Sequence, residues 1–280
     1  MTTTYDIHQQ GPTQLVALDI DGTLAAEGTM DISKAVRDEV TDVRAAGHHV
    51  VLSTGRSLVG VLPIAKELGL TTGWIVASNG AVTAQLDPQA LGGYRLHDVQ
   101  TFDPAPVVRR ARSAFPGARV ATEVLGVGYR VTHVFATHEL NGAQELVAVA
   151  TAIDRHTTRL ILSAPGILDL IGKLAAVGVT VTPSGNNLLD ITPLRLSKAT
   201  ALEAVRAQLG VQSRDTIAVG DGLNDLEMLT WAHRGVAMGH APAKVRAAAN
   251  AVTGTLEEDG AATVLRSLLP KTIPAGSVTG

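Results

Sequence analysis

Cysteine is absent from the 280-residue chain. Its absence excludes disulfide bonds, thiol catalysis, zinc–thiolate sites and iron–sulfur clusters together. Aromatic residues make up only 3% of the chain, which argues against a protein that stacks single-stranded nucleic acid on aromatic side chains. The core must therefore be built from Ala, Val, Leu and Gly. Such a core is typical of a parallel α/β sheet whose strands are buried on both faces.

The chain also lacks a charge excess and long apolar runs. Its 23 Lys and Arg against 26 Asp and Glu give a net charge of −3, so a broad basic surface for nucleic acid is not available. No stretch approaches the roughly 18 uninterrupted apolar residues of a membrane helix. The first ten residues have neither a basic start nor an apolar run, so we expect no signal peptide there. We expect a cytoplasmic protein that binds neither nucleic acid nor membranes, and the sequence indicates no oligomeric state.

Alternating strand and helix patterns occupy both ends of the chain. At about 150 residues per domain, the length predicts two domains. Short apolar runs typical of buried strands stand at Leu15–Ile20, Val50–Leu52, Trp74–Ala77 and Thr216–Val219, and helical patterns follow the first two of them. This alternation predicts βαβ units and a parallel sheet.

The middle of the chain reads differently. Strand-like runs stand at Val131–Phe135 and Arg159–Leu162, and helical patterns at Gln144–Ala152 and Ile167–Val177. We interpret residues 84–184 as an inserted α+β domain. Residues 1–83 and 185–280, which include the strand-like run Leu188–Ile191, then form a discontinuous core.

Reactive side chains follow three of the predicted core strands. They are Asp19 and Asp21 after the first strand, Thr54 after the second, and Asp221, Asn224 and Asp225 after the late one. Lys198 begins the helix that precedes this late strand. Because ligands bind beyond the carboxyl ends of the strands in an open parallel sheet, we expect these groups to meet. Together they suit a hard divalent cation beside a phosphate.

This set of groups favours phosphoryl transfer, which depends on in-line positioning and on stabilisation of the phosphoryl oxygens. Four groups can supply that stabilisation: the Thr54 hydroxyl, the Gly55 N–H, the Lys198 ammonium and the Asn224 amide. A carboxylate nucleophile splits hydrolysis into two easier steps through an aspartyl-phosphate. Since the chain has no cysteine, this role falls to an aspartate.

Four segments, in order along the chain, carry a family resemblance. They are Asp19-Ile20-Asp21-Gly22-Thr23, Ser53-Thr54-Gly55-Arg56, Lys198 and Gly220-Asp221-Gly222-Leu223-Asn224-Asp225. They resemble the four motifs of the haloacid dehalogenase (HAD) superfamily. Ser78-Asn79-Gly80, together with the insertion between the second and third motifs, resembles the Cof-type branch, subfamily IIB. The resemblance covers about residues 14–269 and implies an α/β fold, a Rossmann-like parallel-sheet core with an inserted α+β cap domain.

The resemblance also implies an activity and a role for each motif residue. It implies a Mg²⁺-dependent phosphatase, a phosphoric monoester hydrolase acting on a small phosphorylated metabolite such as a sugar phosphate or a nucleotide-related phosphate. Asp19 would be the nucleophile and a Mg²⁺ ligand, and Asp221 a further ligand. Asp21 would be the general acid and base, with its backbone carbonyl on Mg²⁺. The phosphoryl group would be held by the N–H of Ile20 and by Thr54, Gly55, Lys198 and Asn224. Asp225 would act indirectly, by orienting Lys198 or a metal-bound water.

Some features leave alternatives open. Arg195 stands near the lysine where the branch usually has a glycine, and it could reach the hinge of the insertion or the substrate. The arginines between 109 and 119 are either a solvated helix face or a clamp for a second anionic group. Candidate substrate contacts in the insertion are Glu123, Tyr129 and Arg130. The alternative functions are a phosphotransferase or phosphomutase, and a receiver-like phospho-acceptor signalling module.

Overall fold

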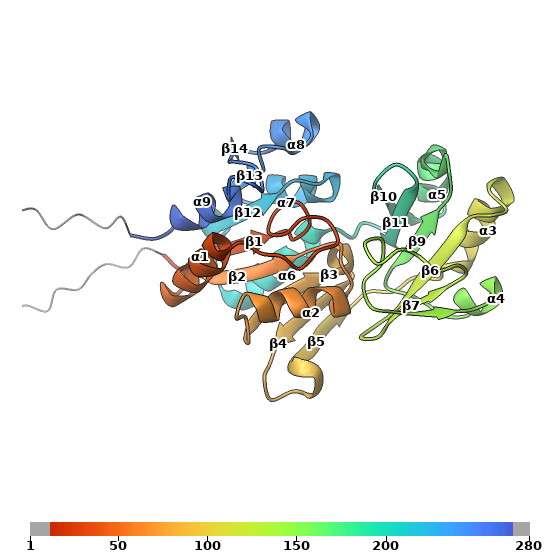
Figure 1. Ribbon diagram of the computed structural model, residues 1–280, viewed down its shortest axis with the longest axis horizontal. Helices are drawn as coiled ribbons and strands as arrows, with labels where there is room; N and C mark the ends of the chain where they lie inside the picture. Colours follow the sequence, from red (N-terminus) through yellow and green to blue (C-terminus); the bar gives the residue numbers. More distant parts are fainter. Residues whose placement is uncertain (1–11, 271–280) are drawn as a thin grey trace, which may run out of the picture.

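The computed structural model describes residues 12–270 (Figure 1). Residues 1–11 and 271–280 lie outside the described residues, and with them the segment where no signal peptide is expected and the outer ends of the predicted core. Within residues 12–270, no helix is long and apolar enough to cross a membrane. The chain forms two sheets, which lie side by side along the long axis of the molecule.

The first sheet has eight strands in the order β14-β13-β12-β1-β2-β3-β4-β5. The strands are β1 (Leu15–Leu18), β2 (His49–Ser53), β3 (Gly73–Ala77), β4 (Val82–Leu86), β5 (Tyr94–Val99), β12 (Thr216–Gly220), β13 (Arg234–Ala237) and β14 (Ala251–Val252). Neighbours from β14 to β3 pair in parallel, and the β4–β5 hairpin adds an antiparallel edge. The predicted α/β fold with a parallel sheet is therefore confirmed.

Helices cover both faces of the first sheet. They are α1 (Lys34–Ala45), α2 (Leu58–Glu67), α6 (Lys198–Leu209), α7 (Leu226–Trp231), α8 (Ala243–Ala248) and α9 (Gly260–Arg266). Because side chains alternate along a strand, Val16 and Leu18 of β1 face a core shared with α1, α2 and α9. Leu15 and Ala17 face the core shared with α6, α7 and α8. All four side chains are fully buried, as expected for a central strand covered on both sides.

The second sheet has six strands in the order β10-β11-β9-β6-β7-β8. The strands are β6 (Arg119–Val124), β7 (Gly128–Val131), β8 (Ala143–Leu146), β9 (Leu160–Ser163), β10 (Val179–Pro183) and β11 (Leu188–Pro193). Its pairs are antiparallel except for β7 and β8. The helices α3 (Ala105–Ala114), α4 (Val149–Ala152) and α5 (Ile171–Ala175) accompany it. An apolar core of its own contains Val120, Leu160 and Ile191.

Strand membership differs from the boundaries expected at residues 84 and 185. The hairpin β4–β5 belongs to the first sheet, so the chain leaves that sheet only after Val99. The run Leu188–Ile191 is a strand as predicted, but as part of β11 it pairs with β9 and β10 of the second sheet. The sequence of a short apolar strand does not identify the strand with which it pairs, so it cannot predict the sheet to which the strand belongs. The division into a catalytic core and a cap domain stays a prediction.

The helix predicted for Gln144–Ala152 is wrong over its first half. Ala143–Leu146 is strand β8, paired with β7, and only Val149–Ala152 is helical. A short segment with few apolar residues has only a weak hydrophobic periodicity, so pairing with a neighbouring strand, here β7, determines its structure.

Candidate active site

The carboxyl ends of three neighbouring strands bring the predicted residues together. The parallel strands β12, β1 and β2 are adjacent, with Leu18 opposite both Val219 and Leu52. The backbone N–H of Asp19 donates to the carbonyl of Val219 at 3.0 Å. Asp19 and the residues after β2 and β12, among them Thr54 and Asp221, therefore lie at one edge of the sheet, where ligands bind in this class of fold.

Lys198 lies buried between two carboxylates. Ser197 caps α6 by accepting the Thr200 N–H, so that the helix begins at Lys198. The ammonium Nζ donates to Asp19 Oδ1 and to Asp225 Oδ1, both at 2.6 Å, and the lysine side chain is fully buried. A buried ammonium needs such partners, because burial removes its hydration. The other oxygen of Asp225, Oδ2, accepts the backbone N–H groups of Asp221 and Gly222 at 3.0 and 2.8 Å, so Asp225 connects Lys198 to the loop after β12.

Negative charge exceeds positive charge around Asp19. Oxygens of Asp19, Asp221 and Asp225 lie within 4.8 Å of one another. Burial and the charge of Asp225 raise the pKa of Asp19 despite its contact with Lys198. Burial and Asp225 also raise the pKa of Asp221 to about 6, although Thr23 donates a hydrogen bond to its Oδ1 at 3.0 Å. One lysine does not neutralise three carboxylates, and a bound cation would relieve the remaining repulsion.

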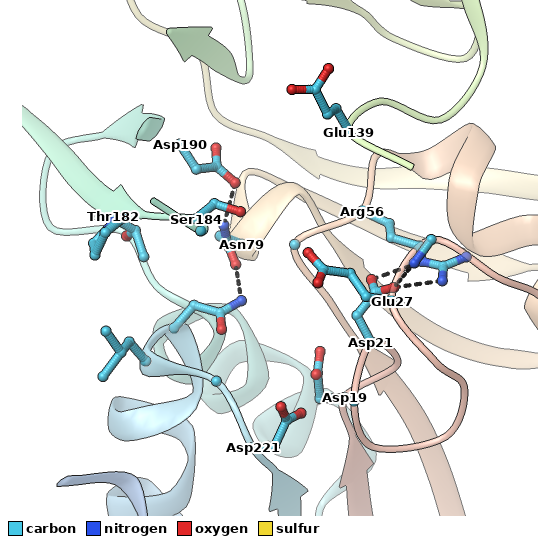
Figure 2. A pocket seen from close by; sticks show the side chains of 18 of the residues that line it. Asp19, Asp21, Glu27, Arg56, Asn79, Glu139, Thr182, Ser184, Asp190 and Asp221 are labelled. Atoms are coloured by element: carbon cyan, nitrogen blue, oxygen red, sulfur yellow. Dashed lines mark hydrogen bonds and ion pairs between the residues drawn. The ribbon is translucent and has the colours of Figure 1, made fainter. Parts of the chain in front are cut away.

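Asp21 forms an ion pair with Arg56 (Figure 2). Arg56 Nε donates to Asp21 Oδ2 at 2.9 Å, and Nη2 donates to Oδ1 at 2.7 Å. The Gly28 N–H also donates to Oδ1, at 3.0 Å. Burial by itself raises the pKa of Asp21, but the hydrogen bonds and charge of Arg56 outweigh it, and the net pKa is lowered. Asp21 is thus held as a carboxylate at the wall of the site.

The residues expected to hold phosphate surround the same point. Thr54 is fully buried, and its hydroxyl oxygen accepts the Arg56 N–H at 3.1 Å, which leaves the hydroxyl hydrogen for another acceptor. The N–H of Ile20 has no acceptor within residues 12–270. Asn224 Nδ2 donates to Asn79 Oδ1 at 3.0 Å. Gly55 lies against both amides, because a Cβ on it would come within 3.4 Å of each.

A cavity of about 330 Å³ opens between the two sheets above these residues (Figure 2). Five of the predicted site residues line it: Asp19, Asp21, Gly55, Asp221 and Asn224. The other four, Ile20, Thr54, Lys198 and Asp225, are buried and do not line it. From the second sheet come the segments 138–141 and 182–185 together with Arg159 and Asp190.

Sequence reasoning missed the Arg159–Asp190 pair. Arg159 Nε donates to the two Asp190 oxygens at 2.9 and 3.0 Å, and Nη1 donates to the Tyr129 hydroxyl at 2.7 Å. Neither residue stands in a recognisable motif, since β9 and β11 meet only in the folded sheet. Arg56 and Asn79 were also missed as pocket residues, although both stand in motif segments.

The residues suggested as substrate contacts lie elsewhere. Glu123 and Tyr129 are buried and do not line the cavity, and Arg130 pairs with Asp154 at 3.1 Å. Arg109 and Arg110 line a separate, open groove with Lys173. Arg195 is exposed in the turn before α6, with a φ of 60°, and does not line the cavity.

Comparison with known proteins gives consistent matches. The family model of the haloacid dehalogenase-like hydrolases matches residues 16–98 and 149–265. Phosphatase YwpJ of Bacillus subtilis is 29% identical over 291 residues, which cover 91% of this chain and 100% of that protein. The 5-amino-6-(5-phospho-D-ribitylamino)uracil phosphatase YitU of the same organism is 28% identical over 263 residues, covering 90% and 96%.

Solved structures match the fold over almost the whole chain. A haloacid dehalogenase-like hydrolase from Bacteroides thetaiotaomicron has a TM-score of 0.77 at 24% identity, covering 92% of this chain and 100% of that one. A sugar phosphatase of HAD subclass IIB has a TM-score of 0.78 at 19% identity, with the same coverage. This chain belongs to the haloacid dehalogenase-like hydrolase family and is a phosphatase of that family.

Proposed function

We propose that the chain is a Mg²⁺-dependent phosphatase that hydrolyses a small phosphorylated metabolite through an aspartyl-phosphate on Asp19. The observation that carries this proposal is the position of Asp19. Its carboxylate lines the cavity, beside Asp221 and in contact with buried Lys198. A carboxylate between a lysine and a cation site can approach a phosphate that would otherwise repel it.

The donor set fits Mg²⁺. Asp19 and Asp221 offer carboxylate oxygens within 4.8 Å of each other, the backbone carbonyl of Asp21 is a third candidate ligand, and hard cations prefer oxygen. The pKa values of Asp19 and Asp221 are raised first by burial and then by the negative charge of Asp225. When bound, Mg²⁺ supplies the positive charge that balances these carboxylates and the phosphate.

In the first step, a carboxylate oxygen of Asp19 attacks phosphorus and the ester P–O bond breaks. The departing oxygen takes a proton from Asp21. For this step the carboxyl group of Asp21 must be protonated and must turn away from Arg56, toward the leaving group. The groups that hold the phosphoryl oxygens are the Ile20 and Gly55 N–H groups, the Thr54 hydroxyl, Lys198 and Asn224.

In the second step, water attacks the phosphorus of the aspartyl-phosphate. The carboxylate of Asp21 takes the proton of this water, the P–O bond to Asp19 breaks, and phosphate leaves. Asp225 holds Lys198 in place through its 2.6 Å contact. Asp19 therefore acts as the nucleophile, and Asp21 acts as the general acid and base.

Release of phosphate from p-nitrophenyl phosphate tests this proposal. Mg²⁺-dependent turnover is expected, and both EDTA and Asp19→Asn should abolish it. Exposed Asp38 offers a matched control, because Asp38→Asn makes the same chemical change far from the cavity. Turnover that survives in Asp19→Asn would contradict an aspartyl-phosphate on Asp19. Mg²⁺-dependent labelling of Asp19 without release of phosphate would favour a phosphomutase or a phospho-acceptor module instead.

The cavity lining supports a neutral, hydroxyl-rich leaving group. The two arginines that line it are already paired, Arg56 with Asp21 and Arg159 with Asp190. Glu27 adds an exposed carboxylate at the wall. A second anionic group on an entering substrate would meet this carboxylate while both arginines are still held by their partners. No Phe, Tyr or Trp from residues 12–270 lines the cavity, and the only aromatic ring that these residues place there is the imidazole of His138. A nucleobase therefore gains little stacking, and of the two predicted substrate classes we propose the sugar or polyol phosphate. The relative YitU is named for a phosphate on a ribityl chain.

A pair of substrates of equal length isolates the effect of charge. Sorbitol 6-phosphate and 6-phosphogluconate are both open six-carbon chains, and only the second carries a carboxylate. We expect kcat/KM to be about tenfold higher for sorbitol 6-phosphate, corresponding to ~1.4 kcal/mol, and Glu27→Gln should narrow this gap. Equal values for the two substrates would contradict the proposed substrate class without affecting the proposed chemistry.

A further inference from the structure

The segment Ser78-Asn79-Gly80 has a strained backbone and lies beside the proposed phosphate site. Its three residues have positive φ angles of 49°, 53° and 102°. This region of backbone space is costly for residues other than glycine, so the surroundings must hold the turn in place. A Cβ on Gly80 would lie 2.4 Å from the carbonyl oxygen of Ser197. The turn thus lies directly against the residue that precedes Lys198.

A chain of hydrogen bonds runs from the second sheet through Asn79 to the loop after β12 (Figure 2). Arg159 holds Asp190, and Asp190 Oδ2 accepts from Asn79 Nδ2 at 2.9 Å. Asn79 Oδ1 then accepts from Asn224 Nδ2 at 3.0 Å. Asn79 is only 7% exposed, so water does not readily replace these partners.

Asp190 determines which group donates and which accepts in each hydrogen bond of this series. The carboxylate of an ion pair only accepts hydrogen bonds. Asp190, which forms an ion pair with Arg159, therefore requires the NH₂ group of Asn79. The carbonyl of Asn79 is thereby turned to Asn224, which must present its own NH₂ group. Since Asn79 uses one hydrogen of that group, the second remains available as a donor to a phosphate oxygen.

We propose that Asn79 is a positioning residue that links the contact with Asp190 to the orientation of the Asn224 amide. The inference rests on the proposed function, because it takes Asn224 as a donor to the phosphoryl group. While Asp190 is in place, the NH₂ of Asn224 is held toward the phosphate. Without the contact to Asp190, Asn79 loses the partner that fixes the orientation of its own amide. Asn224 can then present its carbonyl oxygen, which repels phosphate.

Two neighbouring glycine substitutions separate this role from simple contact between the sheets. Ser78 Oγ donates to Glu123 Oε2 of the second sheet at 2.7 Å, but Ser78 does not line the cavity, and the hydrogen bond of Asn224 goes to Asn79 instead. Glycine adopts positive φ without strain, so Asn79→Gly and Ser78→Gly each preserve the turn and remove one hydrogen bond to the second sheet. We expect Asn79→Gly to lower kcat about tenfold, as for the loss of one oriented hydrogen bond. Ser78→Gly should keep kcat within about twofold.

A double-substitution cycle tests the link between the two amides. Asn79→Gly added to Asn224→Ala should cost no more than about twofold beyond Asn224→Ala alone, because residues that act as a unit are not additive. Full multiplication of the two losses, an unchanged kcat in Asn79→Gly, or an equal loss in Ser78→Gly would each overturn the inference.

Binding of inorganic phosphate, measured by calorimetry in the presence of Mg²⁺, decides the inference separately from turnover. Asn79→Gly should weaken this binding about tenfold, and Ser78→Gly should leave it unchanged. A wild-type protein that binds phosphate but releases none from esters would contradict the proposed function alone. Phosphate binding that is absent, or equal in wild type and Asn79→Gly, would overturn the inference.

Discussion

Single buried charges around the cavity differ in how well they are compensated. Lys198 is fully buried with two carboxylates at 2.6 Å, and Arg159 is buried with Asp190 and Tyr129. Pairs of this kind often stabilise little, because desolvation cancels most of their attraction, while removal of one partner costs about 3–5 kcal/mol. The burial of these charges therefore points to chemistry at the site rather than to stability.

Glu123 is a buried carboxyl group with only one of its two oxygens in hydrogen bonds. Its Oε2 accepts from Ser78 and Thr158, both at 2.7 Å, whereas Oε1 has no partner within residues 12–270. Burial raises its pKa, and the two hydroxyl groups and Arg159 oppose this only in part. A group with a raised folded-state pKa contributes stability that is complete below its unfolded pKa, about 4.3. That contribution is lost as the pH rises through the folded pKa.

We therefore expect Glu123→Gln to reduce the pH dependence of stability. Gln resembles the protonated carboxyl group and does not ionise, so the variant should lose less thermal stability than wild type between pH 5 and pH 8. Melting curves at several pH values measure this difference. Glu227→Gln, at an exposed position, is the control and should follow wild type. Parallel curves for wild type and Glu123→Gln would show that Glu123 is already ionised at pH 5.

At the scale of elements, the turn after β3 and the start of α6 form one unit. The N–H of Asn79 donates to the Thr54 carbonyl at 3.0 Å, so the ends of β2 and β3 are also joined there. Gly80 lies against Ser197, which caps the helix that carries Lys198. A displacement of the turn would therefore move Lys198.

Gly80→Ala should destabilise the protein by at least about 3 kcal/mol, the sum of backbone strain and a clash with a carbonyl oxygen. It should also lower kcat, because the start of α6 must shift. Gly210 is the C-terminal cap of α6 and has a φ of 67°. A Cβ added to it would have no atom within 4 Å. Gly210→Ala should thus cost only about 1 kcal/mol and leave kcat unchanged. Urea unfolding and steady-state kinetics of the two variants provide the measurement, and equal losses of kcat would contradict this account.

At the scale of the whole molecule, the segment 138–142 of the second body, which is the part of the chain that forms the second sheet, lies against the part that forms the first sheet. A Cβ on Gly28 would lie 2.7 Å from the Cβ of His138, and one on Gly60 would lie 2.7 Å from the Cβ of Asn141. The second body can therefore approach this closely only because both positions lack a side chain. His138 and Asn141 also line the cavity, so this contact forms part of its wall.

Gly60→Ala should disturb the contact with Asn141 without weakening the fold. Alanine favours α2 by about 1 kcal/mol over glycine, so the melting temperature should not fall. The new methyl group keeps Asn141 away, and KM should rise about tenfold, corresponding to ~1.4 kcal/mol. Asn141→Gly removes the opposing Cβ, so the double variant should return to the KM of Asn141→Gly alone. A KM that stays high in the double variant would contradict a steric cause.

The sequence alone determined the family, the parallel core and the set of residues that surround Asp19. These features depend on local signals, namely buried strands that end in polar residues, and on the rule that parallel strands share one carboxyl edge. The tertiary structure alone decided which sheet receives β4, β5 and β11. The reason is that a strand's partner depends on long-range hydrogen bonding rather than on its own residues. It also decided the pairs Arg56–Asp21 and Arg159–Asp190 and the bond from Asn79 to Asn224. Each of these contacts joins residues far apart in the chain. Pairing of β1 with β2 and of β9 with β11 brings the two ion pairs together. Asn79 meets Asn224 because β3 and β12 belong to the same sheet and end at the same edge of it.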